Sequence, residues 1–570
     1  MRHQVNHTAS AIIRQAVCTV LDRIDAPVPP ANGLVYPYRN KESSEKVKQN
    51  NIEDLDEFGQ DGCRLFLDLC LMSCGDEPKW LVALDSESVH PSFCLEMMEA
   101  VLNQYVEIFF AFPQFIFLLK ENVCNIVIKN FSPKWNLQSQ LSIEAKVEHY
   151  VIATKILKVV AIMLERYNSV LKTESEIFLS FLIKFLSGEQ WQQAIAVEVL
   201  HKICWKPRQL RDICQQYDLQ NKSNGSTPVF QELINALASV TSSKFHKLYR
   251  NKEDPESPSD AEILDDLSIN KLILNSETQA STERNEIPFV SEDYVLRMSM
   301  SCLLDIATAI IDLGDKELIK RRAANVPIHE INETENTLRQ MIMSGWSGLL
   351  QTLSLLFEAA PDENTVNSVL DLMTALTAVA GGLNMDSPRE ALVGTLCRFA
   401  LPPGYHEKSY AGEQTSGGQV LVVGQPLTAS TSSGAGFVLL TTRNIQVLRA
   451  LLDVASDYGP LLGQSWSLVL SALQHLSWIL GFQCSITGEM TAKVQENGQS
   501  TVLTTAISQE IPKISKKLAD VFENSSKLDE VALHHLVNAI CELSTETMDQ
   551  AYGSATREPS LFGMGLILTE

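Results

Sequence analysis

Residues Gly459–Phe482 read GPLLGQSWSLVLSALQHLSWILGF and contain no Asp, Glu, Lys or Arg. A charge-free stretch of this length could span a bilayer. However, it includes Gln464, Gln474 and His475, which the hydrocarbon core of a membrane tolerates poorly. One helical face carries large apolar residues, namely Trp466, Leu470, Leu473 and Leu476. A helix that is apolar nearly all round is typical of the inner layer of a large helical stack, so we predict a buried core helix here.

The same helical spacing of apolar residues recurs along the rest of the chain. Stripes with this period cover residues 147–164, 230–237, 445–455 and 533–540, and prolines stand between such stretches. Helices joined by short connections predict an all-α fold, an α-solenoid of armadillo- or HEAT-like helical repeats. No strict repeat period is visible, so we expect the repeats to be degenerate.

Four stretches depart from the helical pattern. Residues 25–57 are rich in Pro, Asn and charge and are predicted to be a linker. Residues 251–292 are acidic with few large apolar side chains, which predicts a disordered linker. Residues 402–442 are rich in Gly, Ser and Thr around two short apolar runs, so both a small hairpin and a flexible loop remain open. Residues 484–499 are predicted to be a second flexible loop.

These linkers divide the chain into a short opening helix over 1–24, a helical block over 58–250 and a second helical block over 293–570. The formal charge of −23 argues against nucleic acid as the main partner, because binding to phosphates needs a basic face. The 12 cysteines form no CxxC pair and the N-terminus has no secretory signal, so a reducing, cytosolic compartment fits best. Cys70 and Cys74 lie one helical turn apart on an apolar face and are expected in the core.

No sequence motif for catalysis, nucleotide binding or metal binding is found in the chain. His534 and His535 are helical neighbours whose side chains point about 100° apart, which predicts structural histidines rather than a shared metal. We therefore predict no catalytic residues, no cofactor and no metal. One basic and aromatic cluster includes Lys244, Lys247 and Arg250. It is a candidate surface for anionic lipid or an acidic partner, and the alternative is a helix C-terminus whose cations complement the helix dipole.

Several long segments together resemble the monensin-sensitivity (Mon-two) family, which is related to the large Arf guanine-nucleotide exchange factors. They include TASAIIRQAVCTVLDRI (8–24), DGCRLFLDLC (61–70), FLLKENVCNIVIKNFSP (117–133), ALPPGYHEKSY (400–410) and LHHLVNAICELSTETMDQAYG (533–553). The Gly459–Phe482 stretch belongs to the same set. The resemblance extends over most of the chain outside the linkers.

The resemblance implies a domain order. Residues 1–24 correspond to the end of the N-terminal dimerisation (DCB) region, 58–250 to the HUS region, and 293–570 to the first HDS repeats. The exchange factors carry an Asn-Tyr-Asp-Cys-Asp box late in HUS that supports contact with DCB, and the matching place here keeps Tyr217 and Asp218. These two residues are the candidate interaction site. The alternative is an Asp that closes a helix after Tyr217 packs.

In the exchange factors a catalytic Sec-seven domain follows HUS, and the corresponding slot here is residues 251–292, too short for a domain of about 100 residues. The resemblance therefore implies a non-enzymatic scaffold for vesicle and protein trafficking between endosomes and Golgi, peripheral on Golgi, trans-Golgi and endosomal membranes. The implied partners are a Dopey-type protein, a phospholipid flippase and Arf or Arf-like small GTPases, with a homodimer possible for full-length members.

Two alternative functions remain open. One is an exchange factor isoform that lacks its catalytic domain, and the other is an importin-like helical-repeat transport receptor. Family members carry a complete DCB region and a long C-terminal extension, so we expect this chain to be partial, either a short isoform or an incomplete gene model.

Overall fold

The computed structural model describes residues 2–25, 52–82, 89–130, 143–220, 228–250, 290–324, 333–360, 362–402, 441–480, 482–484, 490–492 and 504–552. These residues form two compact units, and the division falls inside one long helix, between Asp305 and Ile306. Most of the four predicted linkers and loops lies outside the described residues. The choice between a hairpin and a loop for residues 402–442 therefore remains untested.

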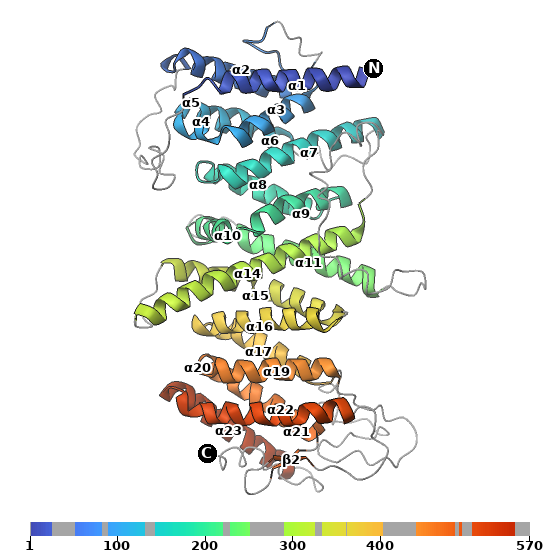
Figure 1. Ribbon diagram of the computed structural model, residues 1–570, viewed down its shortest axis with the longest axis vertical. Coiled ribbons are helices and arrows are strands. Elements are labelled where there is room, and N and C mark those ends of the chain that lie inside the picture. The colour runs from blue at the N-terminus through green and yellow to red at the C-terminus, as the bar shows by residue number, and fades with distance from the viewer. Residues whose placement is uncertain are drawn as a thin grey trace. The chain divides into compact units, whose positions relative to one another are not determined.

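Unit 1 is built from helices that pack in two rows. Its elements are α1 (Arg2–Leu21), η2 (Ile52–Asp54), α2 (Glu57–Ser73), α3 (Pro91–Gln104), α4 (Val106–Ala111), α5 (Pro113–Leu118), η4 (Leu119–Val123), α6 (Cys124–Asn130), α7 (Ile143–Arg166), α8 (Lys172–Phe185), α9 (Gln190–Cys204), α10 (Pro207–Ile213), η6 (Cys214–Leu219), α11 (Val229–Phe245), η8 (His246–Arg250) and the first part of α14 (Glu292–Ala324). In one row α1, α3, α7 and α9 follow one another, each against the next (Figure 1). In the other, α2 packs on α3, while α8 packs on α9 and α11.

Local sequence explains where these helices begin. The Asp56 carboxylate accepts the Gly59 amide at 2.9 Å and caps α2. Proline at the first helical position starts α3, α5 and α10, because its fixed φ suits a helix and its missing N–H would have no partner there. The predicted 25–57 linker therefore ends earlier than expected, since η2 and the Asp56 cap already belong to the structured part.

The core of unit 1 contains an aromatic cluster that joins several helices. Phe109 of α4 packs edge to face on Phe66 of α2, on Phe115 of α5 and on Tyr167, with ring centroids 5.1, 5.3 and 5.8 Å apart. The Tyr167 hydroxyl donates to the Leu102 carbonyl at 2.8 Å. All four rings are almost completely buried. The cluster fixes α2, α4 and α5 against the end of α7.

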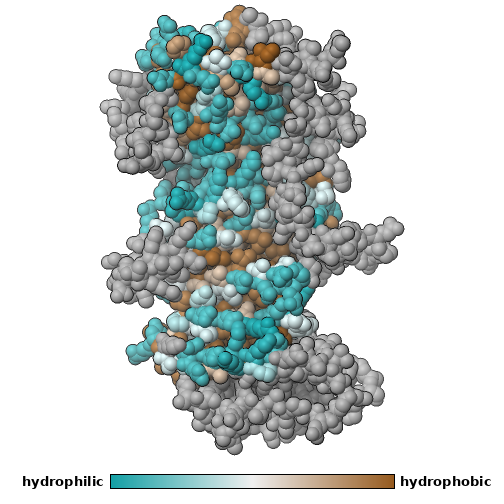
Figure 2. All heavy atoms as spheres, viewed as in Figure 1, coloured by the Kyte–Doolittle hydropathy of each residue, from teal (hydrophilic) through white to brown (hydrophobic). Residues whose placement is uncertain are grey.

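Unit 2 repeats the two-row arrangement. Its elements are the rest of α14, α15 (Glu333–Ala359), α16 (Glu363–Gly382), α17 (Asp386–Ala400), α19 (Thr442–Asp457), α20 (Gly459–Leu462), η9 (Gly463–Ser465), α21 (Trp466–Leu480), β1 (Phe482–Cys484), β2 (Met490–Ala492), α22 (Thr504–Glu523), η10 (Asn524–Lys527) and α23 (Glu530–Tyr552). The helices α16, α19 and α22 pack in sequence, as do α15, α17, α21 and α23. Hydrophilic residues cover much of the described surface on the face shown in Figure 2. The all-α helical-repeat prediction is confirmed.

The charge-free stretch is broken into α20, η9 and α21. The break lies at Gly463, whose φ of +51° is rarely adopted by side chains with a Cβ. A Cβ there would also lie 2.9 Å from the buried guanidinium of Arg389. The predicted core face is confirmed, since Trp466, Leu470 and Leu473 are 1%, 0% and 5% exposed.

Among the described residues, one helical stretch has the length and composition of a membrane span, Glu292–Gly314 in α14, with a mean hydropathy of 1.5. Sixty-one per cent of its apolar window is buried within the protein, as expected for a core helix.

Three details differ from the expected boundaries. β1 and β2 form an antiparallel pair with Phe482 opposite Ala492, so the loop predicted over 484–499 begins as a hairpin. Val290 is buried, and Ser291 Oγ accepts the Tyr294 amide at 3.2 Å at the start of α14. The linker predicted over 251–292 therefore ends before residue 290. The residues of α14 up to Asp305 belong to unit 1 rather than to the second block.

Candidate interaction sites

Tyr217 and Asp218 lie on η6, a single π-helical turn, and both side chains are buried at 2% and 1% exposure. The Tyr217 hydroxyl donates to the Lys172 carbonyl at 2.8 Å, which ties η6 to the start of α8. Burial raises the pKa of this phenol, so it remains a neutral donor. Tyr217 thus packs into the core of unit 1, as expected under the alternative in which Asp218 closes a helix after Tyr217 packs.

Asp218 reaches the N-terminus of α11. Its two carboxylate oxygens accept the backbone N–H groups of Phe230 at 2.9 Å and Gln231 at 3.2 Å. The N-cap residue of α11 is Pro228, which has no side chain able to cap. Asp218 therefore supplies from a distance the acceptor that a local cap would provide, and its charge suits the positive end of the helix dipole. The helix that Asp218 caps is the next one, not its own.

Two lysines of the candidate basic surface form ion pairs within the protein. Lys244 and Lys247 both face Glu292, the first residue of α14, with the Lys244 ammonium 3.9 Å from its carboxylate and that of Lys247 closer. The Lys244 side chain is 14% exposed, whereas that of Lys247 is 63% exposed. The Arg250 side chain lies outside the described residues. The two described lysines therefore connect the end of α11 to α14 inside unit 1.

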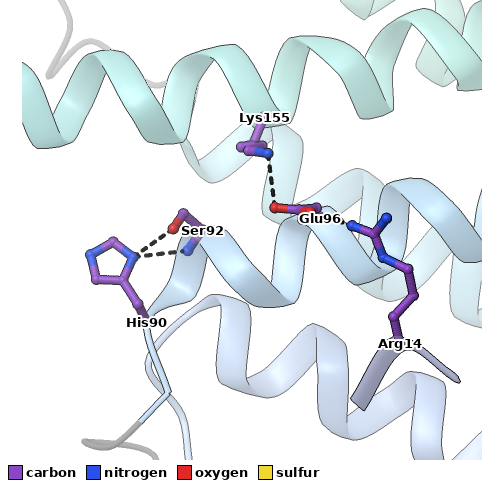
Figure 3. Close-up of polar contacts among 5 residues, drawn as sticks. All are labelled: Arg14, His90, Ser92, Glu96 and Lys155. Carbon is purple, nitrogen blue, oxygen red and sulfur yellow. Dashed lines mark hydrogen bonds and ion pairs between the residues drawn. The ribbon is translucent and has the colours of Figure 1, made fainter. Parts of the chain in front are cut away.

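A second polar site links α1 to the helices behind it. Glu96 of α3 receives Arg14 of α1 on one carboxylate oxygen and Lys155 of α7 on the other, the latter at 3.0 Å (Figure 3). The Lys155 side chain is 8% exposed, so this ion pair is largely shielded from water. At the N-terminus of α3, His90 Nδ1 accepts the Ser92 amide at 3.2 Å (Figure 3).

The far end of α1 is fixed by a tyrosine. The Tyr105 hydroxyl donates to Asp22 Oδ1 at 2.7 Å, and the Cys18 carbonyl lies 3.2 Å away. Burial and this carboxylate both raise the pKa of Tyr105, so it remains a donor. Sequence reasoning did not find the contacts of α1 with Glu96 and Tyr105, because their partners lie more than 80 positions apart in the chain.

One constellation contains the residue types of a hydrolase without the required geometry. His201 Nε2 lies 3.3 Å from Ser301 Oγ and 3.3 Å from Asp305 Oδ2. A catalytic triad needs the carboxylate on one ring nitrogen and the serine on the other. Here both groups face the same nitrogen, so the histidine cannot pass a proton between them.

The buried cysteines are poor nucleophiles. Burial raises the pKa of Cys63 and of Cys124 to about 12, and that of Cys94 to about 11. Such thiols stay protonated near neutral pH. Of the two cysteines predicted in the core, Cys70 is buried and Cys74 is only half-buried; Cys63 is buried as well. In the part of the chain that the structure describes, no group of three or more His, Cys, Asp or Glu could hold a metal ion.

Comparison with known proteins identifies the family of this helical chain. Residues 58–225, from α2 through η6, match the Sec7-like HUS family, described as the Mon2/Sec7/BIG1-like HUS domain. A MON2 homolog from Xenopus laevis is 34% identical over 99% of this chain, and the Homo sapiens homolog is 33% identical over the same share. The chain belongs to the MON2 family. A further MON2 homolog, from Drosophila melanogaster, is 30% identical.

The chain spans 37% of the length of the Xenopus and human MON2 homologs. The HUS match includes Tyr217 and Asp218, together with Glu96 and Lys155. The contacts of α1 therefore attach a segment outside the HUS match to residues inside it. Membership of this family associates the chain with proteins related to Arf exchange factors.

Proposed function

We propose that this MON2-family chain is a non-enzymatic scaffold for vesicle and protein trafficking between endosomes and Golgi. The proposal rests mainly on direct contact between the helices on either side of residues 251–289, the position where the related exchange factors hold their catalytic domain. Lys247 of η8, the turn that follows α11, pairs with Glu292 at the start of α14, and Thr241 Oγ1 of α11 donates to Ser299 Oγ of α14 at 3.0 Å.

The size of that slot supports the same conclusion. Residues 251–289 connect two helices that pack in one unit, and a folded catalytic domain needs about 100 residues or more. The buried thiols and the misaligned His201 site offer no other chemistry in the described part of the chain. Hydrophilic residues instead cover much of the described surface on the face shown in Figure 2, and extended helical-repeat surfaces of this kind suit protein binding.

We further propose that the scaffold acts in Arf and Arf-like GTPase pathways, bound peripherally to Golgi, trans-Golgi and endosomal membranes from the cytosol. A Dopey-type protein and a phospholipid flippase are the proposed partners, and full-length relatives could form homodimers. A net charge of −23 supports protein partners over nucleic acid.

A nucleotide-exchange assay tests the non-enzymatic role. The purified chain is added to Arf and Arf-like GTPases loaded with fluorescent GDP, next to an exchange factor that carries a Sec-seven domain. We expect release at the uncatalysed rate with this chain and rapid release with the control. Clear stimulation by this chain would contradict the proposal. Binding of basic peptides that depends on Ran would instead support an importin-like receptor.

A further inference from the structure

The junction between α9 and α10 exposes a tryptophan among cations. Trp205, the C-cap residue of α9, is 70% exposed, more than the exposed tryptophan of the α2–α3 connection, Trp80, at 38%. An indole left in water at this level is unusual for a residue type that is buried on average. Lys202 lies three positions before Trp205 and so shares its helical face.

Three cations lie close to this indole in the chain, although the whole chain carries a formal charge of −23. The patch consists of Trp205 and the cations Lys202, Lys206 and Arg208; we call it the Trp205 patch.

Carboxylates neutralise only part of this patch. Among the described residues, Glu165 pairs with Lys206, while Lys202 and Arg208 have no ion-pair partner. Two carboxylates on its border are engaged elsewhere, Asp212 with Arg211 and Asp305 with His201.

The backbone beneath the patch is fixed. Gln209 of α10 donates to the Leu164 carbonyl near the end of α7 at 2.6 Å, and Pro207 starts α10 directly after the junction. The ion pair between Lys206 and Glu165 adds a second connection between the same helices. A side chain presented from a rigid junction loses little freedom on binding, which favours recognition.

We propose that the Trp205 patch binds an acidic protein segment that also supplies an apolar side chain to cover the indole. Tryptophan and arginine are the residues most enriched at the energetic centres of protein interfaces. Unpaired cations beside the indole favour carboxylates in the partner. Lys202 is partly buried, and flexible carboxylate side chains reach such a group more readily than the flat face of a bilayer does.

This inference extends the proposed scaffold function by giving the chemistry of one partner, and its test is a binding measurement that is independent of nucleotide exchange. The full chain is titrated into a fluorescein-labelled peptide in which Asp and Glu alternate with Leu and Phe, and anisotropy is recorded. Two control peptides replace the acidic residues with Lys or the apolar residues with Ser. We expect binding of the first peptide alone.

Three variants locate the binding site. Trp205→Ala should weaken binding by roughly tenfold or more. The double variant K202Q/R208Q should weaken it and remove much of its salt dependence. Trp80→Ala is the matched control, because it removes another exposed indole of unit 1 next to a lysine, and it should leave binding unchanged. Circular dichroism confirms that each variant keeps its helices.

Several outcomes would overturn the proposal. They are no binding of the acidic and apolar peptide, equal binding by the Trp205→Ala variant, or equal loss in the Trp80→Ala variant. Flotation with phosphatidylcholine and phosphatidylserine vesicles forms the last arm. Vesicle binding that depends on Trp205, without peptide binding, would identify a bilayer as the occupant and refute a protein segment.

Discussion

Replacing Asp218 with Ala should loosen α11 without disturbing unit 2. The Asp218 side chain is 1% exposed and accepts the amides of Phe230 and Gln231, which begin α11. With the carboxylate removed, the Phe230 amide loses its acceptor where little water can replace it, and the Gln231 amide loses its acceptor in a partly buried position. Each lost hydrogen bond of this kind costs about 1 kcal/mol or somewhat more, so the variant should lose about 2–3 kcal/mol.

Hydrogen exchange measured by mass spectrometry is the suitable assay, because a chain of two units need not unfold in a single transition. A loss of about 2–3 kcal/mol corresponds to roughly 30- to 150-fold faster exchange of the α11 amides. Asp218→Asn keeps one acceptor oxygen, so its α11 amides should exchange faster than in the wild type and slower than in Asp218→Ala. Asp362→Ala, which removes the exposed cap of α16, is the control and should change exchange in unit 2 only.

Equal α11 exchange in the wild type and the Asp218→Ala variant would refute this reasoning. It would mean that water or another group satisfies the two amides at no cost. Faster exchange throughout both units would also refute it, because it would show a global role for the residue rather than a local cap.

Three further predictions concern unit 2 and the thiols. Leu473→Asp places a charge at a 5% exposed core position of α21 and should unfold unit 2, seen as loss of protease resistance, whereas a folded variant would contradict the core assignment. Gly463→Ala should destabilise unit 2 by about 1–3 kcal/mol in urea titrations, because of its positive φ and the close guanidinium of Arg389; an unchanged midpoint would contradict this. Exposed Cys541 should react rapidly with a thiol reagent at pH 8, while Cys63, with its pKa raised to about 12, stays protonated and should react only after unfolding; equal rates would contradict its burial.

The fold could be predicted from the sequence to the extent that it depends on local periodicity. The buried face of α21, with Trp466, Leu470 and Leu473, was predicted correctly because the spacing of apolar residues along one helix decides which side is buried. The break at Gly463 could not be predicted, because it depends on Arg389, which lies more than 70 positions earlier. The short hairpin of β1 and β2 was missed because its residues have no strong alternation.

The candidate site was predicted only in part for a similar reason. Sequence resemblance selected Tyr217 and Asp218, but not which helix Asp218 would cap, since the acceptor and its amides are 12 and 13 positions apart. The contact of Glu96 with Arg14 and Lys155 joins three helices, and no local pattern marks such a group. Which distant charges pair is decided by how the helices pack, and the periodicity of a single sequence carries no information on that packing.

The basic residues at the end of α11 show how packing can change the meaning of a pattern. As a sequence, Lys244 and Lys247 present cations that could meet a membrane or an acidic partner. In the fold Glu292 takes both ammonium groups and holds the start of α14 against α11. Among the described residues of unit 1, Lys202 and Arg208, close to the exposed Trp205 in the chain, have no ion-pair partner. We therefore propose the α9–α10 junction as the site for an acidic partner, whereas Lys244 of α11 and Lys247 of η8 hold α14 in place within unit 1.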